Sequence, residues 1–512
     1  MFYWILLNLD SHMRFSFNNI QLLACAPAKV LKNQGIDLLL EDFISSINSL
    51  NENGIDINGE KYYAFLAFCM GDTLALQWLG GFVEGVGTAY RFCRNCEITY
   101  EDRKDLDPTI KNEVRTMAKH LCQLQNIEEA EDKAFYMKVF GVKNKSILLN
   151  IKDFDICTSL LQDAMHTLIE GVCIKEIKCL LKNLLDKAYF DLAKLNGLML
   201  SFKYSDFDKN DLPKKFEKNH IYNNEATLSS NAGQILILMI NLPLIIGHLI
   251  KNDDKNWNNF MNLNKIVNLS YSFTYEDSTI CVLENLIIKY LQNFKALYED
   301  ATITPKMHYL THLPQQLKDF GPLRHSSCFR FEAKNGLIKG MDFKSFKNLS
   351  FSITMHHQFW LSGQQHDSKS KKSIAYNHDI FRVDFQIDQS HKFWMDLEPK
   401  RYINKLKYLK INGFQYKSGY FLILNKYKFS QAIGLIVDIL KVDDQVIFYL
   451  NEYKILKKDI HNDCLVIEAT ENFFYKRFTE LTLRNAQYSL KYNNSIYLQV
   501  RYNHYHYEIN KQ

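Results

Sequence analysis

The spacing of apolar positions changes along the chain and predicts three kinds of structure. The first part mixes short extended runs with an amphipathic segment, Asp37–Leu50, whose helical spacing predicts a helix. The Asn58-Gly59 pair separates two extended runs and predicts a hairpin turn. The following run, Tyr62–Cys69, is apolar at successive positions and predicts a buried strand that ends just before Asp72.

Helical spacing dominates the middle of the chain, from about residue 74 to residue 298. One stretch, Ala226–Ile250, carries no charged residue, but its polar residues and Pro243 argue against a membrane span. We expect Pro243 to end a buried core helix, with a second short helix after it. The strongest helical patterns are Leu160–Lys182, Tyr189–Phe202, Asn231–Asn241 and Ile280–Glu299.

Strand patterns return after a polar stretch at residues 363–373, whose composition is typical of a linker. Short apolar runs at close spacing predict a small β-barrel or sandwich in the last part of the chain. These runs are Gly413–Leu424, Ala432–Leu440, Val446–Glu452 and Cys464–Glu468.

The composition is that of an ordinary folded protein. Of the 512 residues, 47% are hydrophobic and 23% charged, and the formal net charge is +5, so contact with nucleic acid needs a local basic patch. The 11 cysteines are odd in number and irregularly spaced, which favours a reducing compartment over a disulfide framework. The apolar N-terminus lacks a basic segment and a cleavage site, so we expect an intracellular protein that is not secreted.

Two carboxylates stand where they can present ligands to a metal ion. Asp72 follows the predicted buried strand, and Glu332 lies in a helix predicted to open at Phe329. Clustered carboxylate oxygens suit Mg²⁺, and a pair of such ions can cleave a phosphodiester bond. Taken alone, Asp72 is more simply explained as a helix N-cap, and Glu332 as a solvated helix carboxylate.

Four soft ligands have the spacing of a zinc site. Cys93-x2-Cys96 matches half of a tetrahedral site, and His308-x3-His312 places two imidazoles on one helix face. The two halves lie far apart in the sequence. The alternative is therefore a pair of free buried thiols and two unrelated histidines.

Two further groups carry polar side chains at helical spacing. Asp163, His166 and Glu170 share a helix face, which suits a metal pair or an acid–base pair but also a polar stripe inside a bundle. The helix expected after Phe329 carries several basic side chains. They either contact DNA phosphates or are simply exposed to solvent. These cations are Arg330, Lys334 and Lys339.

The order of these motifs is more specific than any one of them. The chain reads GDTLALQWLGGFVEGVGTAYRFCRNC, then LLQDAMHTLIEGV, LPLIIGHLI, TPKMHYLTHLPQQLKDFGPL and FRFEAKNGLIKGMDFKSFKNLS. This succession resembles the transposases of CACTA (En/Spm-like) elements and, more narrowly, transposase-derived proteins of animal genomes. The resemblance covers roughly residues 1–362 and, more loosely, the β-rich end.

The resemblance implies an α/β RNase H-like core that a large all-α insertion interrupts, with a small β-barrel-like domain at the C-terminal end. Residues 1–84 would be a partial core, 85–320 the insertion, 321–362 the return to the core, 363–380 a linker and 381–512 the β-rich domain. Asp72 then corresponds to the second Asp of a DDE triad and Glu332 to its final Glu, both as magnesium ligands for DNA strand cleavage and transfer. Asp163 and His166 correspond to a family motif whose role the residues do not reveal.

The pattern is also similar to the catalytic subunit of the V(D)J recombinase. There, a CxxC after the second Asp and a histidine pair before the Glu share one zinc ion. That likeness implies a structural zinc on Cys93, Cys96, His308 and His312. The zinc would join the two roots of the insertion beside the carboxylates.

The family's first Asp lies on a strand upstream of the one predicted at Met1–Asn8, and the present sequence starts after it. Asp10 follows the wrong strand to replace it. We therefore expect a transposable-element-derived protein whose DDE activity is lost or incomplete. The alternative is a non-enzymatic nuclear protein that binds DNA or chromatin. The resemblance further implies DNA, at the element ends, as the partner and a nuclear location. It allows a homo-oligomer and implies no membrane partner.

Overall fold

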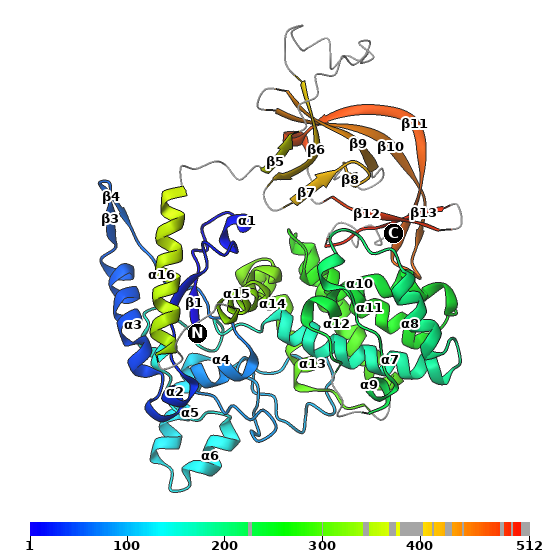
Figure 1. The fold of residues 1–512 in the computed structure, drawn as a ribbon. Coiled ribbons are helices and arrows are strands. Elements are labelled where there is room, and N and C mark those ends of the chain that lie inside the picture. The colour runs from blue at the N-terminus through cyan, green and yellow to red at the C-terminus, as the bar shows by residue number, and fades with distance from the viewer. Residues whose placement is uncertain are drawn as a thin grey trace. The chain divides into compact units, whose positions relative to one another are not determined.

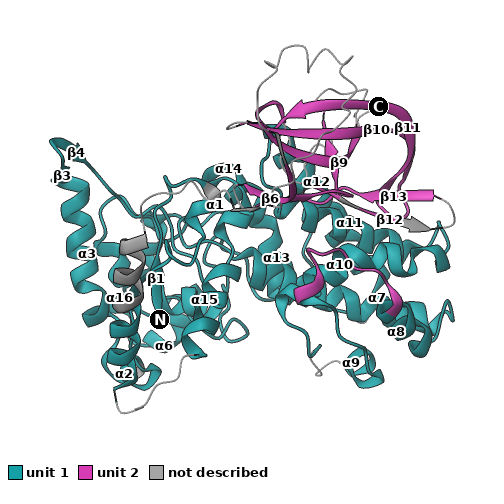
Figure 2. Ribbon diagram, turned by 45° about the horizontal axis from the view of Figure 1, so that its top comes forward, with its two compact units in different colours: residues 1–200, 211–362 teal, residues 201–210, 363–512 magenta. Residues whose placement is uncertain are grey.

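The computed structural model describes residues 1–223, 228–298, 301–340, 348–367, 375–378, 403–411, 414–424, 433–442, 445–481, 486–492 and 495–502. The chain forms two compact units (Figure 2), Met1–Leu200 with Asp211–Ser362, and Ser201–Asn210 with Gly363–Gln512. Helices dominate the first unit and an antiparallel sheet the second, so the fold mixes α and β structure (Figure 1). The predicted linker at residues 363–380 lies partly outside the described residues.

Short strands and one long helix make up the N-terminal part of the first unit. The predicted hairpin forms, and its turn residues Asn58 and Gly59 both have positive φ, which an Asn-Gly pair accommodates. The predicted helix is α3, which buries Leu40 and Ile44. The elements are β1 (Phe2–Trp4), α1 (Ser11–Arg14), β2 (Gln21–Ala24), α2 (Ala28–Gln34), α3 (Asp37–Glu52), β3 (Ile55–Ile57), β4 (Glu60–Tyr62) and α4 (Thr73–Leu79), with β1 antiparallel to β2.

The predicted buried strand over Tyr62–Cys69 is wrong for most of its length. Tyr63 and Phe65 are 62% and 70% exposed. Tyr62 ends the hairpin strand β4, and the next paired residue of the run is Cys69, whose N–H donates to Ser159 at 2.8 Å in a parallel bridge. An apolar run becomes a buried strand only where neighbouring strands and a covering layer enclose it, and here only its end is enclosed.

That bridge brings together two segments that are distant in the sequence. Cys69 pairs in parallel with Leu160, so the residues that follow each of them leave the pair at the same edge. Asp72 follows the first segment and Asp163 the second. Asp72 and Asp163 are 91 positions apart in the sequence (163 − 72), yet each follows one of two segments that are paired with each other.

Helices fill the middle of the chain, as predicted, although several bounds differ. The pattern over Leu160–Lys182 begins later, at Met165, and its first part is a π-helix that includes His166. π-Helices are rare and occur often at functional sites. The elements are α5 (Met117–Glu129), α6 (Lys133–Phe140), η1 (Ile147–Asn150), η2 (Met165–Cys173), α7 (Ile174–Asp186), α8 (Leu192–Ser201), η3 (Lys209–Asp211), α9 (Lys218–Tyr222), α10 (Ala232–Ile246), η4 (Gly247–Leu249), α11 (Lys255–Ser270), α12 (Asp277–Leu297), α13 (Pro305–Tyr309), η5 (Leu310–His312), α14 (Leu313–Phe320), η6 (Leu323–Ser326), α15 (Phe329–Lys339) and α16 (Leu349–Asp367).

Helix α10 continues through Pro243, contrary to the prediction that this proline ends it. Proline has no N–H, so the carbonyl of Met239 loses its helical donor. The side-chain amide of the buried Asn264, on α11, donates to that carbonyl instead. By length and composition alone, Ala232–Leu249 could span a membrane, but 67% of it is buried inside the protein, which fits a core helix.

The second unit is a curled antiparallel sheet with strand order β12-β13-β11-β10-β9-β6-β5, and β7 and β8 pair at its side (Figure 1). The prediction of a strand-rich C-terminal part is confirmed. The segment Ser201–Asn210, which runs from the last residue of α8 into η3, belongs to this unit. There, Arg501 donates to both carboxylate oxygens of Asp208 at 2.8 and 2.9 Å. The strands are β5 (Ala375–His378), β6 (Ile403–Ile411), β7 (Phe414–Lys417), β8 (Phe421–Ile423), β9 (Ile433–Val442), β10 (Gln445–Asp459), β11 (Cys464–Arg477), β12 (Tyr488–Tyr492) and β13 (Ser495–Gln499), with η7 (Phe478–Glu480) after β11.

Candidate metal centre

The four predicted zinc ligands converge in the first unit. Sγ of Cys93 lies 3.3 Å from Nε2 of His312, and Sγ of Cys96 lies 3.3 Å from Nε2 of His308. The two Nε2 atoms are 3.2 Å apart. A tetrahedron of sulfur and nitrogen ligands around zinc has edges of about 3.3–3.8 Å. The cluster can therefore hold a metal ion such as zinc, although its halves are 212 and 219 positions apart in the sequence.

The two residues between the cysteines, Arg94 and Asn95, hold the cysteine loop in place. Arg94 is 1% exposed, and its guanidinium donates to the carbonyls of Leu160 and Leu161 at 2.9 and 2.7 Å and to the side chain of Gln162 at 2.9 Å. The N–H of Asn95 points at Sγ of Cys93 from 3.4 Å, which favours a thiolate there. The loop is thus tied to the segment that leads into Asp163.

The histidines come from a helix whose start the sequence specifies. The hydroxyl of Thr304 caps α13 by accepting from the N–H of Met307, and Pro305 occupies the first turn. His308 is fully buried, and its ring contacts that of Phe92 edge-on at 5.5 Å. His312 follows one turn later in η5, so both imidazoles share a face, as predicted.

The pKa values of the two thiols shift in opposite directions. Burial raises the pKa of Cys93, but its hydrogen bond with Cys96 and the two histidines outweigh burial and hold that pKa well below its usual range. The hydrogen bond with Cys93 and burial raise the pKa of Cys96. One negative charge is therefore already favoured at the cluster, and a cation would stabilise a second.

Asp72 is a helix N-cap, as its local sequence predicts. Its Oδ1 accepts from the N–H of Ala75 at 2.6 Å at the start of α4. The carboxylate also acts electrostatically on Lys306 and on the thiol of Cys328. Capping uses one oxygen, so the same residue can still offer the other to a cation.

Asp163 and His166 form a hydrogen-bonded pair that also reaches Glu332. Nδ1 of His166 makes a short contact with Asp163, and its Nε2 lies 3.0 Å from Oε1 of Glu332. Burial lowers the pKa of His166, but Asp163 and Glu332 outweigh it and raise the pKa above its ordinary value. The sequence grouped His166 with Glu170; its contact with Glu332 joins residues 166 positions apart (332 − 166) that no spacing rule connects.

Lys306 is the cation that faces this acidic group. A Cβ at Gly171 would lie 2.3 Å from Cδ of Lys306, so the absence of a side chain at Gly171 is what allows the lysine to approach. Burial lowers the pKa of Lys306, while Glu170, Asp163 and Asp72 raise it. Sequence reasoning missed this residue, although it lies two positions before a candidate zinc ligand.

The candidate DNA-contacting cations differ in exposure. Lys334 is 3% exposed, and its ammonium donates to the carbonyls of Phe17 and Ile20 at 2.6 and 2.7 Å. Arg330 donates to the carbonyl of Phe15 at 3.0 Å. Only Lys339 of the three is exposed without such an internal bond among the described contacts. Its role and theirs in binding DNA remain predictions.

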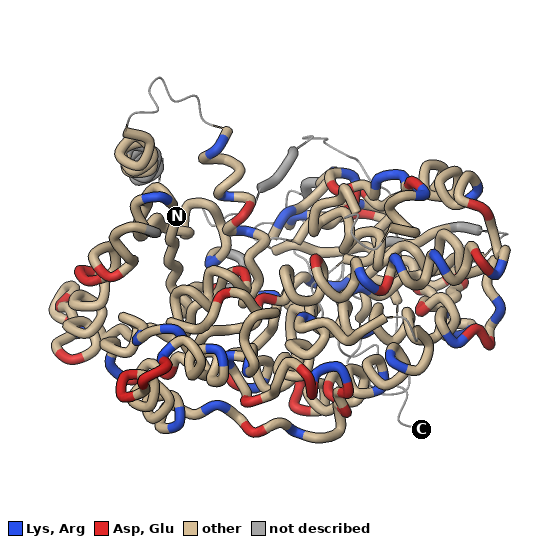
Figure 3. The backbone as a smooth tube through the Cα atoms, turned by 90° about the horizontal axis from the view of Figure 1, so that it is seen from below, with Lys and Arg blue, Asp and Glu red and all other residues tan. Residues whose placement is uncertain are grey.

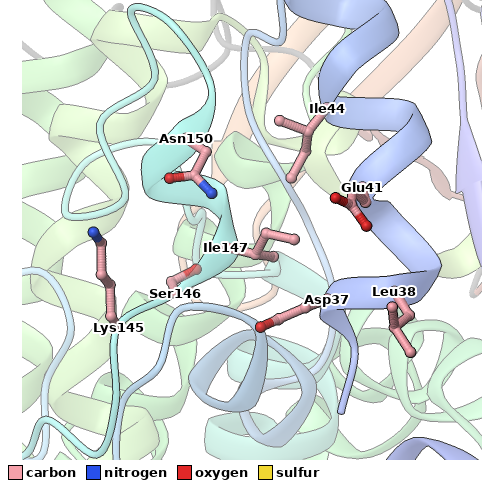
Figure 4. Close-up of a pocket in the computed structure, with 8 residues that line it drawn as sticks. All are labelled: Asp37, Leu38, Glu41, Ile44, Lys145, Ser146, Ile147 and Asn150. Carbon is pink, nitrogen blue, oxygen red and sulfur yellow. The ribbon is translucent and has the colours of Figure 1, made fainter. Parts of the chain in front are cut away.

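Described residues of the first unit line a cavity near its N-terminal helix and another beside the metal-ligand cluster. The cavity of Figure 4, about 450 Å³, lies between α3 and η1 and has Asp37 and Glu41 on one wall and Lys145 on the other. A second cavity, about 400 Å³, borders the metal-ligand cluster at Cys96 and His312. Lys and Arg are mixed with Asp and Glu along most of the chain in Figure 3, and the sequence contains one short acidic run, Glu128-Glu129-Ala130-Glu131-Asp132. A binding site must therefore be sought in specific clusters of residues.

Comparison with known proteins gives no assignment. No protein-family profile matches the chain, and no curated protein matches it either. The evidence on function is therefore the geometry of the cluster and the resemblance of the motifs.

Proposed function

We propose that the first unit derives from a DDE transposase, with a zinc ion on the Cys/His cluster and a metal-dependent DNA site built around Asp72 and Glu332. The observation that carries the proposal is the cluster itself, because it joins the two ends of a long helical segment. In an RNase H-like core interrupted by an insertion, such a zinc ion would hold together the two ends of the insertion.

Hydrogen bonds connect the cluster to the carboxylates on both sides. Arg94, between the two cysteines, binds the segment that ends at Asp163. After the histidines, Gln316 on α14 accepts from the N–H of Gln162 at 2.9 Å and donates to its carbonyl at 3.1 Å. The amide of Gln316 also donates to Ser326, shortly before the helix that bears Glu332. A zinc ion would therefore stabilise the position of the segment that ends at Asp163 and the position of the helix that bears Glu332.

The acidic groups would bind Mg²⁺ or Mn²⁺ and, through the ion, a DNA phosphate. Lys306 and Lys339 would offset phosphate charge. Asp163 is not free for this, since its two oxygens accept from the backbone N–H groups of Met165, His166 and Cys328. We therefore expect DNA binding with little or no strand cleavage from this chain.

The test is an assay of the full chain, purified with zinc, on supercoiled plasmid and linear duplex DNA with Mn²⁺ or Mg²⁺. The matched variant is Asp72→Asn/Glu332→Gln. Metal-dependent nicking that this variant lacks supports a surviving DDE site. Metal-dependent binding without nicking supports the non-enzymatic, DNA-binding alternative. If the chain neither binds nor nicks DNA at low salt, the proposal fails.

A further inference from the structure

Asp163 orients the imidazole of His166, and both oxygens of its carboxylate are occupied by hydrogen bonds. Oδ1 of Asp163 accepts from the N–H groups of Cys328 at 3.0 Å and Met165 at 3.2 Å. Oδ2 accepts from the N–H of His166 at 3.1 Å and contacts its Nδ1. Asp163 is 2% exposed. A carboxylate that accepts Nδ1–H orients the ring, so in the neutral imidazole the lone pair available to a ligand is on Nε2.

That lone pair faces another acceptor. Nε2 of His166 lies 3.0 Å from Oε1 of Glu332. A neutral imidazole nitrogen and a carboxylate oxygen repel at this distance unless a cation lies between them. A proton can fill that role, and so can a metal ion, because two cis ligands at roughly 2.1 Å from an octahedral ion lie about 3.0 Å apart.

We propose that Nε2 of His166 and the carboxylate of Glu332 together bind a divalent transition-metal ion, a class represented by Mn²⁺. This rests on the proposed function and deepens it, since it names a nitrogen ligand for the ion that Glu332 would hold. Asp163 then acts as a positioning residue, in the way that carboxylates orient metal-bound histidines.

The surroundings suit an ion at this position. Glu332 is 49% exposed as a side chain and His166 17%, so the pair is open to solvent on one side. Glu170 adds negative charge near both residues. Cys328 is close, and burial raises the pKa of its thiol, which disfavours the thiolate form that binds metals. An imidazole with carboxylate ligands favours Mn²⁺ or Zn²⁺ over Mg²⁺, which prefers oxygen.

The experiment is a Mn²⁺ titration of the full, zinc-loaded chain followed by electron paramagnetic resonance. Pulsed measurements report nitrogen coupling to the bound ion, which a structural role for His166 would not produce. His166→Ala removes the nitrogen ligand, Glu332→Gln weakens the oxygen ligand, and His248→Ala is the matched control at an exposed histidine. We expect one bound Mn²⁺ with nitrogen coupling, affinity reduced at least tenfold in the first two variants, and no change in the control.

The other outcomes separate this inference from the proposed function. Bound Mn²⁺ without nitrogen coupling, or with equal affinity in His166→Ala, overturns the role of His166 and leaves a carboxylate site. Absence of bound Mn²⁺ in the wild-type chain overturns the ion site itself. Zinc content and melting temperature are measured for each variant, and His166→Asn replaces His166→Ala if that variant has lost zinc or stability.

Discussion

A single carboxylate at Asp72 has to serve the start of a helix and, on our proposal, a metal ion. Capping needs an acceptor oxygen, whereas ion binding needs negative charge. Asparagine keeps the acceptor and removes the charge, and alanine removes both. These two substitutions therefore separate the roles.

We expect Asp72→Ala to lower the free energy of unfolding by about 1 kcal/mol, because the N–H of Ala75 loses its acceptor. Asp72→Asn should change it by no more than about 0.5 kcal/mol, since Asn caps as well as Asp. Urea unfolding of the three proteins measures both values. Equal destabilisation by the two substitutions would contradict the cap.

The buried carboxyl group of Glu176 predicts a dependence of stability on pH. Tyr290 and Tyr298 donate to it at 3.0 and 3.1 Å, but burial outweighs them and raises its pKa to about 7. The folded state therefore holds this proton more tightly than the unfolded chain. The resulting stability is fully present below the unfolded pKa of about 4.3 and is lost as the pH rises through 7.

Glu176→Gln should remove this contribution, because glutamine stays neutral. We expect the wild-type free energy of unfolding to fall by roughly 2–3 kcal/mol more than that of the variant between pH 5 and pH 8. Urea titrations at several pH values give the comparison. Parallel pH profiles for the two proteins would show that Glu176 is ionised in the folded state throughout.

At the scale of elements, α11 supplies α10 with a hydrogen-bond donor that α10 lacks. The amide of Asn264 takes the place of the N–H that Pro243 lacks. Asn264→Ala should cost about 1–3 kcal/mol by leaving the buried carbonyl of Met239 unpaired. In a Pro243→Ala background the helix supplies its own N–H, so the cost should be smaller by about 1 kcal/mol.

A double-mutant cycle in urea isolates that coupling. Asn264 also accepts from Asn268, but this bond is lost in both backgrounds and cancels. Additive effects of the two substitutions would mean that the amide is not the substitute donor.

Elements with local signals could be predicted, and those that depend on distant partners could not. The Asn58-Gly59 turn and the cap at Thr304 depend on residues adjacent in sequence, and both form. The run Tyr62–Cys69 has no fully buried residue, because burial needs neighbouring strands, which its own residues do not specify. Pro243 stays helical for a similar reason, since its substitute donor is on another helix.

The same limit applies to the candidate site. Spacing and motif order predicted the Cys/His cluster, because each half has a regular internal spacing. The contact of His166 with Glu332 and the approach of Lys306 to Gly171 join distant segments, and nothing local marks them. Lys334 was grouped with exposed cations, yet it is buried because the N-terminal segment supplies carbonyl acceptors for it.

For the molecule as a whole, the second unit includes a segment taken from the middle of the chain. Asp208 in that segment is paired with Arg501, and the side chains are 2% and 13% exposed. Removing one partner of a buried pair leaves an uncompensated charge, which typically costs about 3–5 kcal/mol. Arg501→Ala should therefore destabilise the second unit strongly.

Hydrogen exchange followed by mass spectrometry can localise this effect. We expect faster exchange in β9, β10 and β11 of the variant, with amides of α7 and α11 in the first unit as an internal control. Arg501→Lys keeps the charge but loses the guanidinium, whose Nε also donates to Gln499, and should lie between. Unchanged exchange in the sheet would mean that the pair does not anchor the segment.

The central claim is that one metal ion joins the two ends of the helical segment, and the most direct test is the zinc content of the purified full chain by mass spectrometry. The account predicts one tightly bound zinc per chain, lost in His308→Ala/His312→Ala and retained in His248→Ala. A wild-type chain without zinc after expression in zinc-supplemented medium, or zinc retained by the double variant, would contradict it.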